Sequence, residues 1–121
     1  MNTEQTFLAV YLGSQMNEKM KAWHGMPEAE RRAREREGID AWKAWAERHQ
    51  GAIVTIGGPL GKTKRVDGTG TSEVTNQLTG FSVVRAASHD EAAKLFENHP
   101  HFSRFPGEAV EIMPVLPIPN M

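Results

Sequence analysis

Two histidines and an arginine lie close together near the C-terminal end of the chain, in the stretch HPHFSR that begins at His99. An imidazole exchanges protons near neutral pH and a guanidinium binds anions, so this stretch is a candidate acid/base site. We predict that His99 or His101 acts as the acid or base and that Arg104 contacts an anionic group. In the alternative interpretation, His99 completes a buried helix face, while His101 and Arg104 are solvated.

Asp40 is a candidate catalytic partner of these histidines. It lies in the second half of a predicted helix, where a carboxylate beside Trp42 and His49 would have an environment able to shift its pKa. In the alternative, Asp40 is a surface residue next to Gly38. His49 would then only interact with the helix dipole at the C-terminal end of the helix.

Tyr11 and Trp23 are candidate substrate-binding residues. Together with Trp42 and Trp45 they would line a cleft for a small aromatic molecule. Aromatic residues at helical spacing also form cores, which is the alternative role for all four. Trp23 lies outside the regular helix, so it is the one that we expect to touch a ligand.

Neither a metal site nor a nucleotide site is predicted. A His-x-His pair needs at least one more ligand to hold zinc, and Glu108 is the available carboxylate. The stretch GGPLGKT, which begins at Gly57, lacks the spacing of a phosphate-binding loop, because only three residues separate Gly57 from Gly61. We therefore predict no metal and no cofactor, and we interpret this stretch as a turn.

The composition excludes several classes of protein. The 121 residues fit a single domain over residues 1–121, and a net charge of −1 gives no field that would recruit nucleic acid or an anionic membrane. The apolar run Phe7–Leu12 is too short for a membrane span and has no basic flank, so we expect no signal peptide. Without cysteines there are no disulfides, which is compatible with the cytoplasmic location that we expect.

The periodicity predicts four strands and two long helices that must position the candidate residues. The strands are Phe7–Leu12, Ala52–Ile56, Leu78–Arg85 and Ala109–Val115, and the helices run from Pro27 to the cap at Gly51 and from Ser88 to His99. We expect Phe7–Leu12 to be central and buried on both faces, and Ala109–Val115 to be an edge strand because Pro114 cannot donate a ladder hydrogen bond.

Three shorter features complete this prediction. The residues 17–24 form a single helical turn or an ordered loop, since Gly25 and Pro27 stop the pattern. Gly38 marks a bend in the first long helix, and Pro100 ends the second. The polar segment between Leu60 and Leu78 is a long hairpin connection with short strand extensions.

The order β-α-β-β-α-β is that of the ferredoxin-like α+β fold, a four-stranded antiparallel sheet with two helices on one face. That layout leaves the other face of the sheet bare. Because the strands are apolar on both faces, we expect a homodimer in which the two sheets face each other.

The sequence resembles the YCII-related proteins of the dimeric α+β barrel group. The resemblance rests on the order of its motifs from Phe7 to Val115, among them GGPL at Gly57, LTGF at Leu78, SHDEA at Ser88 and VEIMPV at Val110. It implies a ferredoxin-like subunit, a dimer closed by facing sheets and a cleft in each subunit.

The resemblance also implies a site. Some members of the family act on small aromatic or haloaromatic compounds, and a His-Asp pair has been proposed as catalytic. This sequence has no histidine at the first position, which falls near Asp40 or Ala41, and it has His99 where the family has an aspartate before a proline.

Two functions follow as hypotheses. The first is an enzyme that acts on a small, aromatic molecule by proton transfer or elimination, of the lyase, isomerase or dehydrohalogenase type, without metal or nucleotide. The second is a homodimer that binds a ligand, or assists another protein, without catalysis.

Overall fold

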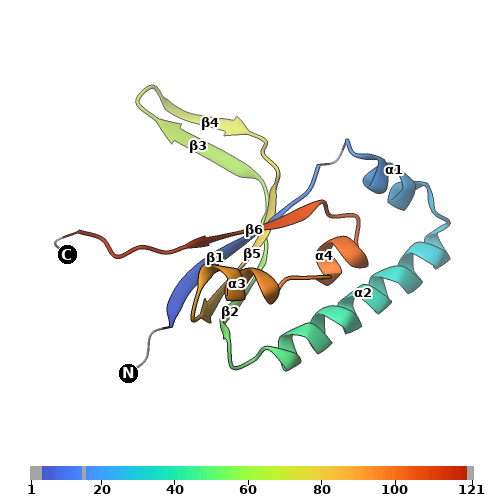
Figure 1. Cartoon of the computed structure of the whole chain (residues 1–121). Coiled ribbons are helices and arrows are strands. Elements are labelled where there is room, and N and C mark those ends of the chain that lie inside the picture. Colours follow the sequence, from blue (N-terminus) through green and yellow to red (C-terminus); the bar gives the residue numbers. More distant parts are fainter. Residues whose placement is uncertain (1–3, 15, 120–121) are drawn as a thin grey trace.

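The computed structural model describes residues 4–14 and 16–119, and Figure 1 shows the arrangement of their helices and strands. The elements in chain order are β1 Gln5–Leu12, α1 Glu18–Gly25, α2 Glu28–Arg48, β2 Ile53–Pro59, β3 Thr63–Asp67, β4 Gly70–Val74, β5 Leu78–Ala86, α3 His89–Lys94, α4 Pro100–Ser103 and β6 Ala109–Pro114.

The main sheet has four strands in the order β2-β5-β1-β6, and every neighbouring pair is antiparallel. The central strand β1 pairs on both sides, so that Tyr11 lies opposite Gly80 of β5 and Val110 of β6. Strand β6 is at one edge and ends at Pro114. The predicted ferredoxin-like α+β fold, the central first strand and the edge position of the last strand are confirmed.

The two faces of β1 are covered to different extents. Phe7, Ala9 and Tyr11 face the helices and are between 0% and 3% exposed. Leu8 and Val10 alternate with them on the opposite face and are only half-buried. The expectation that this strand is buried on both faces is therefore wrong within a single chain, because the helices cover only one side of the sheet.

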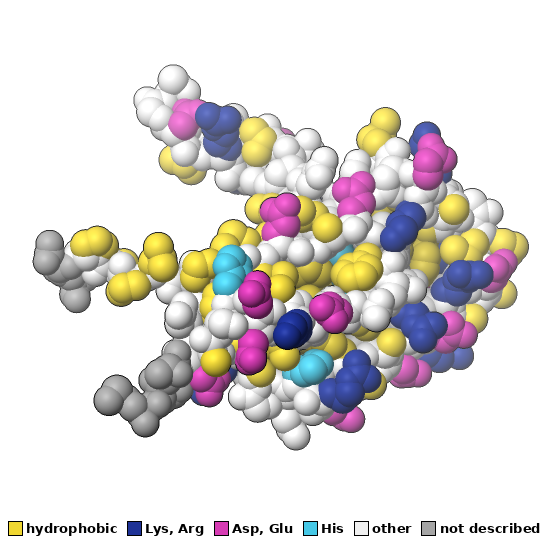
Figure 2. All heavy atoms as spheres, in the orientation of Figure 1, with side chains coloured by type: hydrophobic (Ala, Val, Ile, Leu, Met, Phe, Trp, Pro, Cys, Tyr) yellow, Lys and Arg dark blue, Asp and Glu magenta, His cyan; other side chains and the backbone are white. Residues whose placement is uncertain are grey.

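The core lies between the sheet and helices α2 and α3. Phe7 and Val84 of the sheet pack there with Trp45 of α2 and with Ala92 and Phe96 from the α3 segment. The exposed face of α2 is charged, and it carries ion pairs at i,i+4 spacing, in which Arg32 lies 2.6 Å from Glu28 and Arg34 lies 3.6 Å from Glu30. Figure 2 shows basic and acidic side chains interspersed on the side of the molecule in view.

Helix α2 runs unbroken through Gly38. Gly38 has a packing role there, because a Cβ on it would lie 2.5 Å from the ring of Phe105. This glycine lets the aromatic ring lie directly against the helix backbone.

The segment around Pro100 differs from the prediction. Helix α3 ends at Lys94, and Asn98 adopts a positive φ of 55° before a new short helix begins. Pro100 is the first residue of α4, where its missing N–H has no partner to lose. The proline therefore starts a helix instead of ending one, and His99 is the N-cap of α4.

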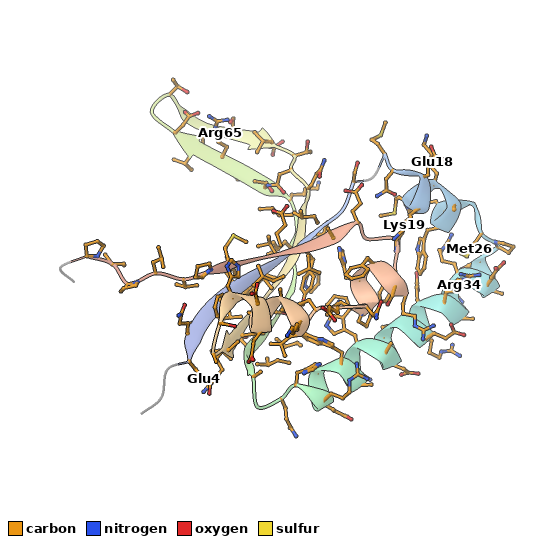
Figure 3. All side chains as sticks on the ribbon, in the orientation of Figure 1. Glu4, Glu18, Lys19, Met26, Arg34 and Arg65 are labelled. Atoms are coloured by element: carbon orange, nitrogen blue, oxygen red, sulfur yellow. The ribbon has the colours of Figure 1, made fainter. Side chains whose placement is uncertain are left out.

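Helix α1 is longer than the single turn expected from the sequence. It spans Glu18–Gly25, and its N-cap is Asn17, whose side chain accepts a hydrogen bond from the backbone N–H of Met20. Lys19, which is labelled on α1 in Figure 3, donates to the carbonyl of Phe102 in α4 and to that of Gly107 in the segment after α4. Helix α1 thereby holds the segment that connects α4 to β6.

The polar connection between β2 and β5 forms the predicted hairpin. Strands β3 and β4 pair only with each other and project away from the main sheet (Figure 1). In the described residues, no helix combines the length and the apolar character needed to cross a membrane.

Candidate active site

A largely apolar cavity of about 570 Å³ lies between helix α2 and the strands β2 and β5. Trp42 and Phe105 supply aromatic wall area, and Ile39 and Ile56 add aliphatic surface. The volume is in the range of pockets that bind small organic molecules.

Glycines keep the strand side of this cavity open. A Cβ on Gly80 would lie 3.1 Å from the ring of Tyr11. Gly57 has a φ of +69°, and a Cβ there would collide with the carbonyl oxygen of Phe81. Gly58 also lines the cavity, where nothing lies within 4 Å of a Cβ built on it. A flat molecule can therefore approach the strand backbone closely.

His101 is the histidine that lines the cavity. The residue is 8% exposed, and Nε2 lies 2.7 Å from the carbonyl oxygen of Leu12. Because a carbonyl only accepts, Nε2 carries the proton, and in the neutral ring Nδ1 is the acceptor. Burial lowers the pKa of His101, so the ring is neutral at pH 7 and ready to take a proton.

Two backbone segments hold the His101 ring in place. Gly107 packs against it so closely that a Cβ would overlap its Cε1 and Nε2 atoms. The loop that carries Gly107 is fixed in turn by Lys19, and by a hydrogen bond of 2.8 Å from the Asn17 side chain to Glu108.

Tyr11 lines the same cavity and carries a neutral hydroxyl. Its Oη lies 2.7 Å from Ser82 Oγ, and Ser82 Oγ donates to the carbonyl of Ile56. Because the Ser82 proton is used in the bond to Ile56, Tyr11 is the donor in its bond to Ser82. The lone pairs of Tyr11 Oη are then free to accept a hydrogen bond from a ligand. Desolvation raises the pKa of Tyr11 to about 12, which keeps it protonated.

His99 lies behind the cavity wall and does not line it. It is fully buried, and its Nδ1 accepts a hydrogen bond of 3.0 Å from the backbone N–H of His101. Its ring meets Trp42 and Trp45 in edge-on geometry, with centroid distances of 4.6 and 4.5 Å. Desolvation is the main cause that lowers the pKa of His99 to about 3. The His99 ring is therefore neutral at physiological pH, and it positions the backbone of His101. Of the two histidines, His101 is the candidate for proton exchange.

The Nε2 atom of His99 has no hydrogen-bond partner, and it is the one such fully buried side-chain nitrogen or oxygen in residues 4–14 and 16–119. Because Nδ1 is an acceptor, Nε2 must carry the proton. The His99 ring lies against the rings of Trp42 and Trp45 in edge-on geometry, and the face of an aromatic ring is a weak acceptor for an N–H group.

Comparison with known proteins assigns the chain to a family. The family model of the YCII-related domain matches residues 17–118. The chain belongs to the YCII-related family. Comparison of this YCII-related chain with curated proteins gave no match.

A solved structure shares the fold of this YCII-related chain. It is a 5-chloro-2-hydroxyhydroquinone dehydrochlorinase from Burkholderia phenoliruptrix in complex with 2,5-dihydroxybenzoquinone. The two chains are 19% identical with a TM-score of 0.51, and the match covers 89% of this chain and 90% of the dehydrochlorinase. The resemblance predicted from the sequence is confirmed.

The structure of the YCII-related chain brings only part of the predicted site together. His101 and Tyr11 share the cavity, with His99 behind them. Asp40 is exposed on α2, and Arg104 is exposed at the end of α4, and neither lines the cavity. Their predicted roles as catalytic partner and anion contact therefore have no support from the geometry.

Trp23 lies in a neighbouring groove. Its ring is 5.8 Å from that of Phe105, which lines both the groove and the main cavity. Trp45 is 1% exposed and belongs to the core, as its alternative interpretation proposed. His49 is the C-cap of α2.

Several lining residues were not predicted. Lys43 and Phe105 border the cavity, and Ser82 fixes the hydroxyl of Tyr11. The helical spacing of Ile39, Lys43 and Ala46 was a signal for one shared face of α2. Nothing in the sequence indicated that Phe105 lies over Gly38.

Metal ligands do not converge in this part of the molecule. Within the described ranges, no group of three or more His, Cys, Asp or Glu side chains is arranged to hold an ion.

Proposed function

We propose that this YCII-related chain is an enzyme that acts on a small aromatic or quinone-like molecule bound in the cavity. The observation that carries the proposal is the position of His101, a neutral imidazole held by Leu12 at the wall of an apolar, aromatic-lined cavity. A general base needs such a ring, with one nitrogen oriented by a hydrogen bond and the other free.

The proposed chemistry is proton transfer or elimination at a hydroxylated ring. The hydroxyl proton of the substrate moves to Nδ1 of His101, and the electron pair left on oxygen forms a carbonyl. The imidazolium then returns the proton to a ring carbon, which gives the keto tautomer and completes the proton transfer. Where that carbon carries a halogen, loss of a proton from a second ring hydroxyl forms a second carbonyl, and the displaced electron pair expels the halide with its bonding pair. The apolar walls strengthen the interaction between imidazolium and anion, because few other polar groups screen it.

The fold comparison supports the choice of substrate class but not the individual residues. The dehydrochlorinase with the same fold binds a dihydroxylated six-membered ring compound. Its low sequence identity means that substrates for this chain are to be found by testing a panel.

The enzymatic proposal is tested by turnover of hydroxylated and halogenated aromatic compounds. The variant His101→Gln keeps an N–H donor for Leu12 but has no basic nitrogen, so kcat should fall by about 100-fold or more with a small change in KM. For the native protein, kcat/KM should fall on acidification with a midpoint below pH 6.5, the ordinary pKa of histidine, because only the neutral ring accepts a proton.

The matched control is His24→Gln, which changes an exposed histidine of α1 outside the cavity. It should leave kcat unchanged. Equal turnover by native protein and His101→Gln would overturn the role of His101. Binding of panel compounds without any turnover would favour the non-catalytic ligand-binding function instead.

We also propose that the active form is a homodimer built through the open faces of two sheets. Leu8 lies between Val83 and Met113 across three strands, and Val10 lies beside Phe81 in the next row. Such an apolar face is normally covered in soluble α+β proteins. A cytoplasmic location stays a prediction, which the absence of cysteines supports.

A further inference from the structure

Lys43 is the one charged side chain among the described residues that line the cavity. It is exposed on α2 and therefore lies at the mouth of the cavity. None of the ion pairs in the described residues involves it, although Asp40 and Glu47 are three and four positions away on the same helix. The ammonium group is thus available to a ligand.

The hydroxyl and imidazole groups inside the cavity present only acceptors. Tyr11 donates its proton to Ser82, and His101 donates its Nε2 proton to Leu12. The hydroxyl of Thr79 also lines the cavity, and it donates to the carbonyl of Tyr11 at 3.0 Å. A ligand that satisfies these side chains must bring its own donors, as a phenolic hydroxyl does.

We propose that the cavity selects a hydroxylated aromatic carboxylate. The hydroxyl groups of the ring face His101 and Tyr11, and the carboxylate lies at the mouth against Lys43. This inference rests on the proposed function and specifies its substrate class. It also moves the anion contact from Arg104, where the sequence suggested it, to a side chain that borders the cavity.

The contact of the carboxylate with Lys43 and the contacts of the ring hydroxyls with His101 and Tyr11 should contribute differently to affinity. Lys43 is solvent-exposed, so its pairing with a carboxylate should improve affinity only about two- to fivefold and should weaken with added salt. A ring that lacks hydroxyl donors leaves buried acceptors unpaired, which should weaken binding about tenfold or more.

The probes are three compounds that differ in one feature at a time, and binding is measured by NMR titration of the native protein and its variants. They are 2,5-dihydroxybenzoate, its neutral amide 2,5-dihydroxybenzamide and 2,5-dimethoxybenzoate. The native protein should bind the first compound about two- to fivefold more tightly than the amide. The dimethoxy compound should bind most weakly.

Variants separate the charge of Lys43 from its shape. Lys43→Met should abolish the preference for carboxylate over amide, and Lys43→Arg should keep it. The control Lys94→Met removes a positive charge from α3, outside the cavity, and should leave the preference as in the native protein.

The outcomes separate this inference from the proposed function. Equal binding of carboxylate and amide, or a preference that survives in Lys43→Met, overturns the role of Lys43 while the cavity remains a binding site. Equal binding of dimethoxy and dihydroxy compounds overturns the selection of hydroxyl donors. If none of the three compounds binds, both this inference and the proposed function lose their support.

Discussion

At the scale of residues, the site depends on two histidines with different tasks. His101 lines the cavity, and the hydrogen bond of its Nε2 to the carbonyl of Leu12 orients its ring. His99 is enclosed by aromatic rings and holds the backbone of His101 through Nδ1. The motif His-Pro-His at residues 99–101 therefore contains one candidate base, His101, and one histidine with a structural role, His99.

The buried state of His99 predicts a dependence of stability on pH. Its pKa is about 3 in the folded protein and near 6.5 in the unfolded chain, so between these values the unfolded state binds the extra proton. The free energy of unfolding should therefore fall as the pH drops from 6.5 toward 3, by up to about 1.4 kcal/mol per pH unit from this residue. The lowered pKa of His101 adds in the same direction.

This dependence can be measured by urea unfolding at several pH values. The comparison is with His99→Asn, whose side-chain oxygen can still cap α4 but does not titrate. The free energy of unfolding of His99→Asn should depend less steeply on pH than that of the native protein, and the difference should correspond to one proton. An identical slope in the native protein and the variant would show that His99 is not held neutral in the folded state.

At the scale of elements, the cavity exists because helix α2 and the segment after α4 fit closely together. Phe105 lies against Gly38 on one side and borders the cavity on the other. Helix α1 supports the arrangement from outside, through the hydrogen bonds of Lys19 to Phe102 and Gly107.

The contact between Gly38 and Phe105 predicts the effect of a single methyl group. Gly38→Ala should push the ring away from the helix and destabilise the protein by about 1–3 kcal/mol, even though alanine favours helix. Gly25→Ala is the matched control, because nothing lies within 4 Å of a Cβ at that position. Chemical denaturation measures both. A Gly38→Ala protein as stable as the control would contradict the close packing.

The long elements were predictable from sequence, and the connections between them were not. Alternating or continuous apolar runs defined the strands. The second long helix begins as predicted at Ser88, whose side chain caps α3 by accepting from the N–H of Glu91. Pro100 was ambiguous, because a proline suits both the end of one helix and the start of another. The cavity depends on contacts between distant segments, such as Tyr11 with Ser82, and sequence spacing alone does not encode these.

In the whole molecule, one face of the sheet is left uncovered by the helices, and this is the face through which we propose that two copies pair. Leu8, Val83 and Met113 form an apolar row across it, and no helix covers them. We therefore expect a dimeric mass in solution at micromolar concentration.

The substitution Leu8→Glu places a charge in the centre of that face. It should produce a folded monomer, because the side chain is only half-buried in the single chain while the dimer would bury it completely. Ala33→Glu, on the exposed face of α2, is the control and should remain dimeric. Sedimentation velocity distinguishes the two, and a monomeric native protein would contradict the pairing of sheets.

We propose that a small hydroxylated aromatic compound binds in the cavity against His101. The most direct measurement is a crystal structure of the protein soaked with 2,5-dihydroxybenzoate. We predict ligand density between Trp42 and the strand glycines Gly57 and Gly80, with one hydroxyl at about 2.7–3.0 Å from Nδ1 of His101. An empty cavity at saturating ligand, or ligand bound only in the groove beside Trp23, would contradict the proposed binding against His101.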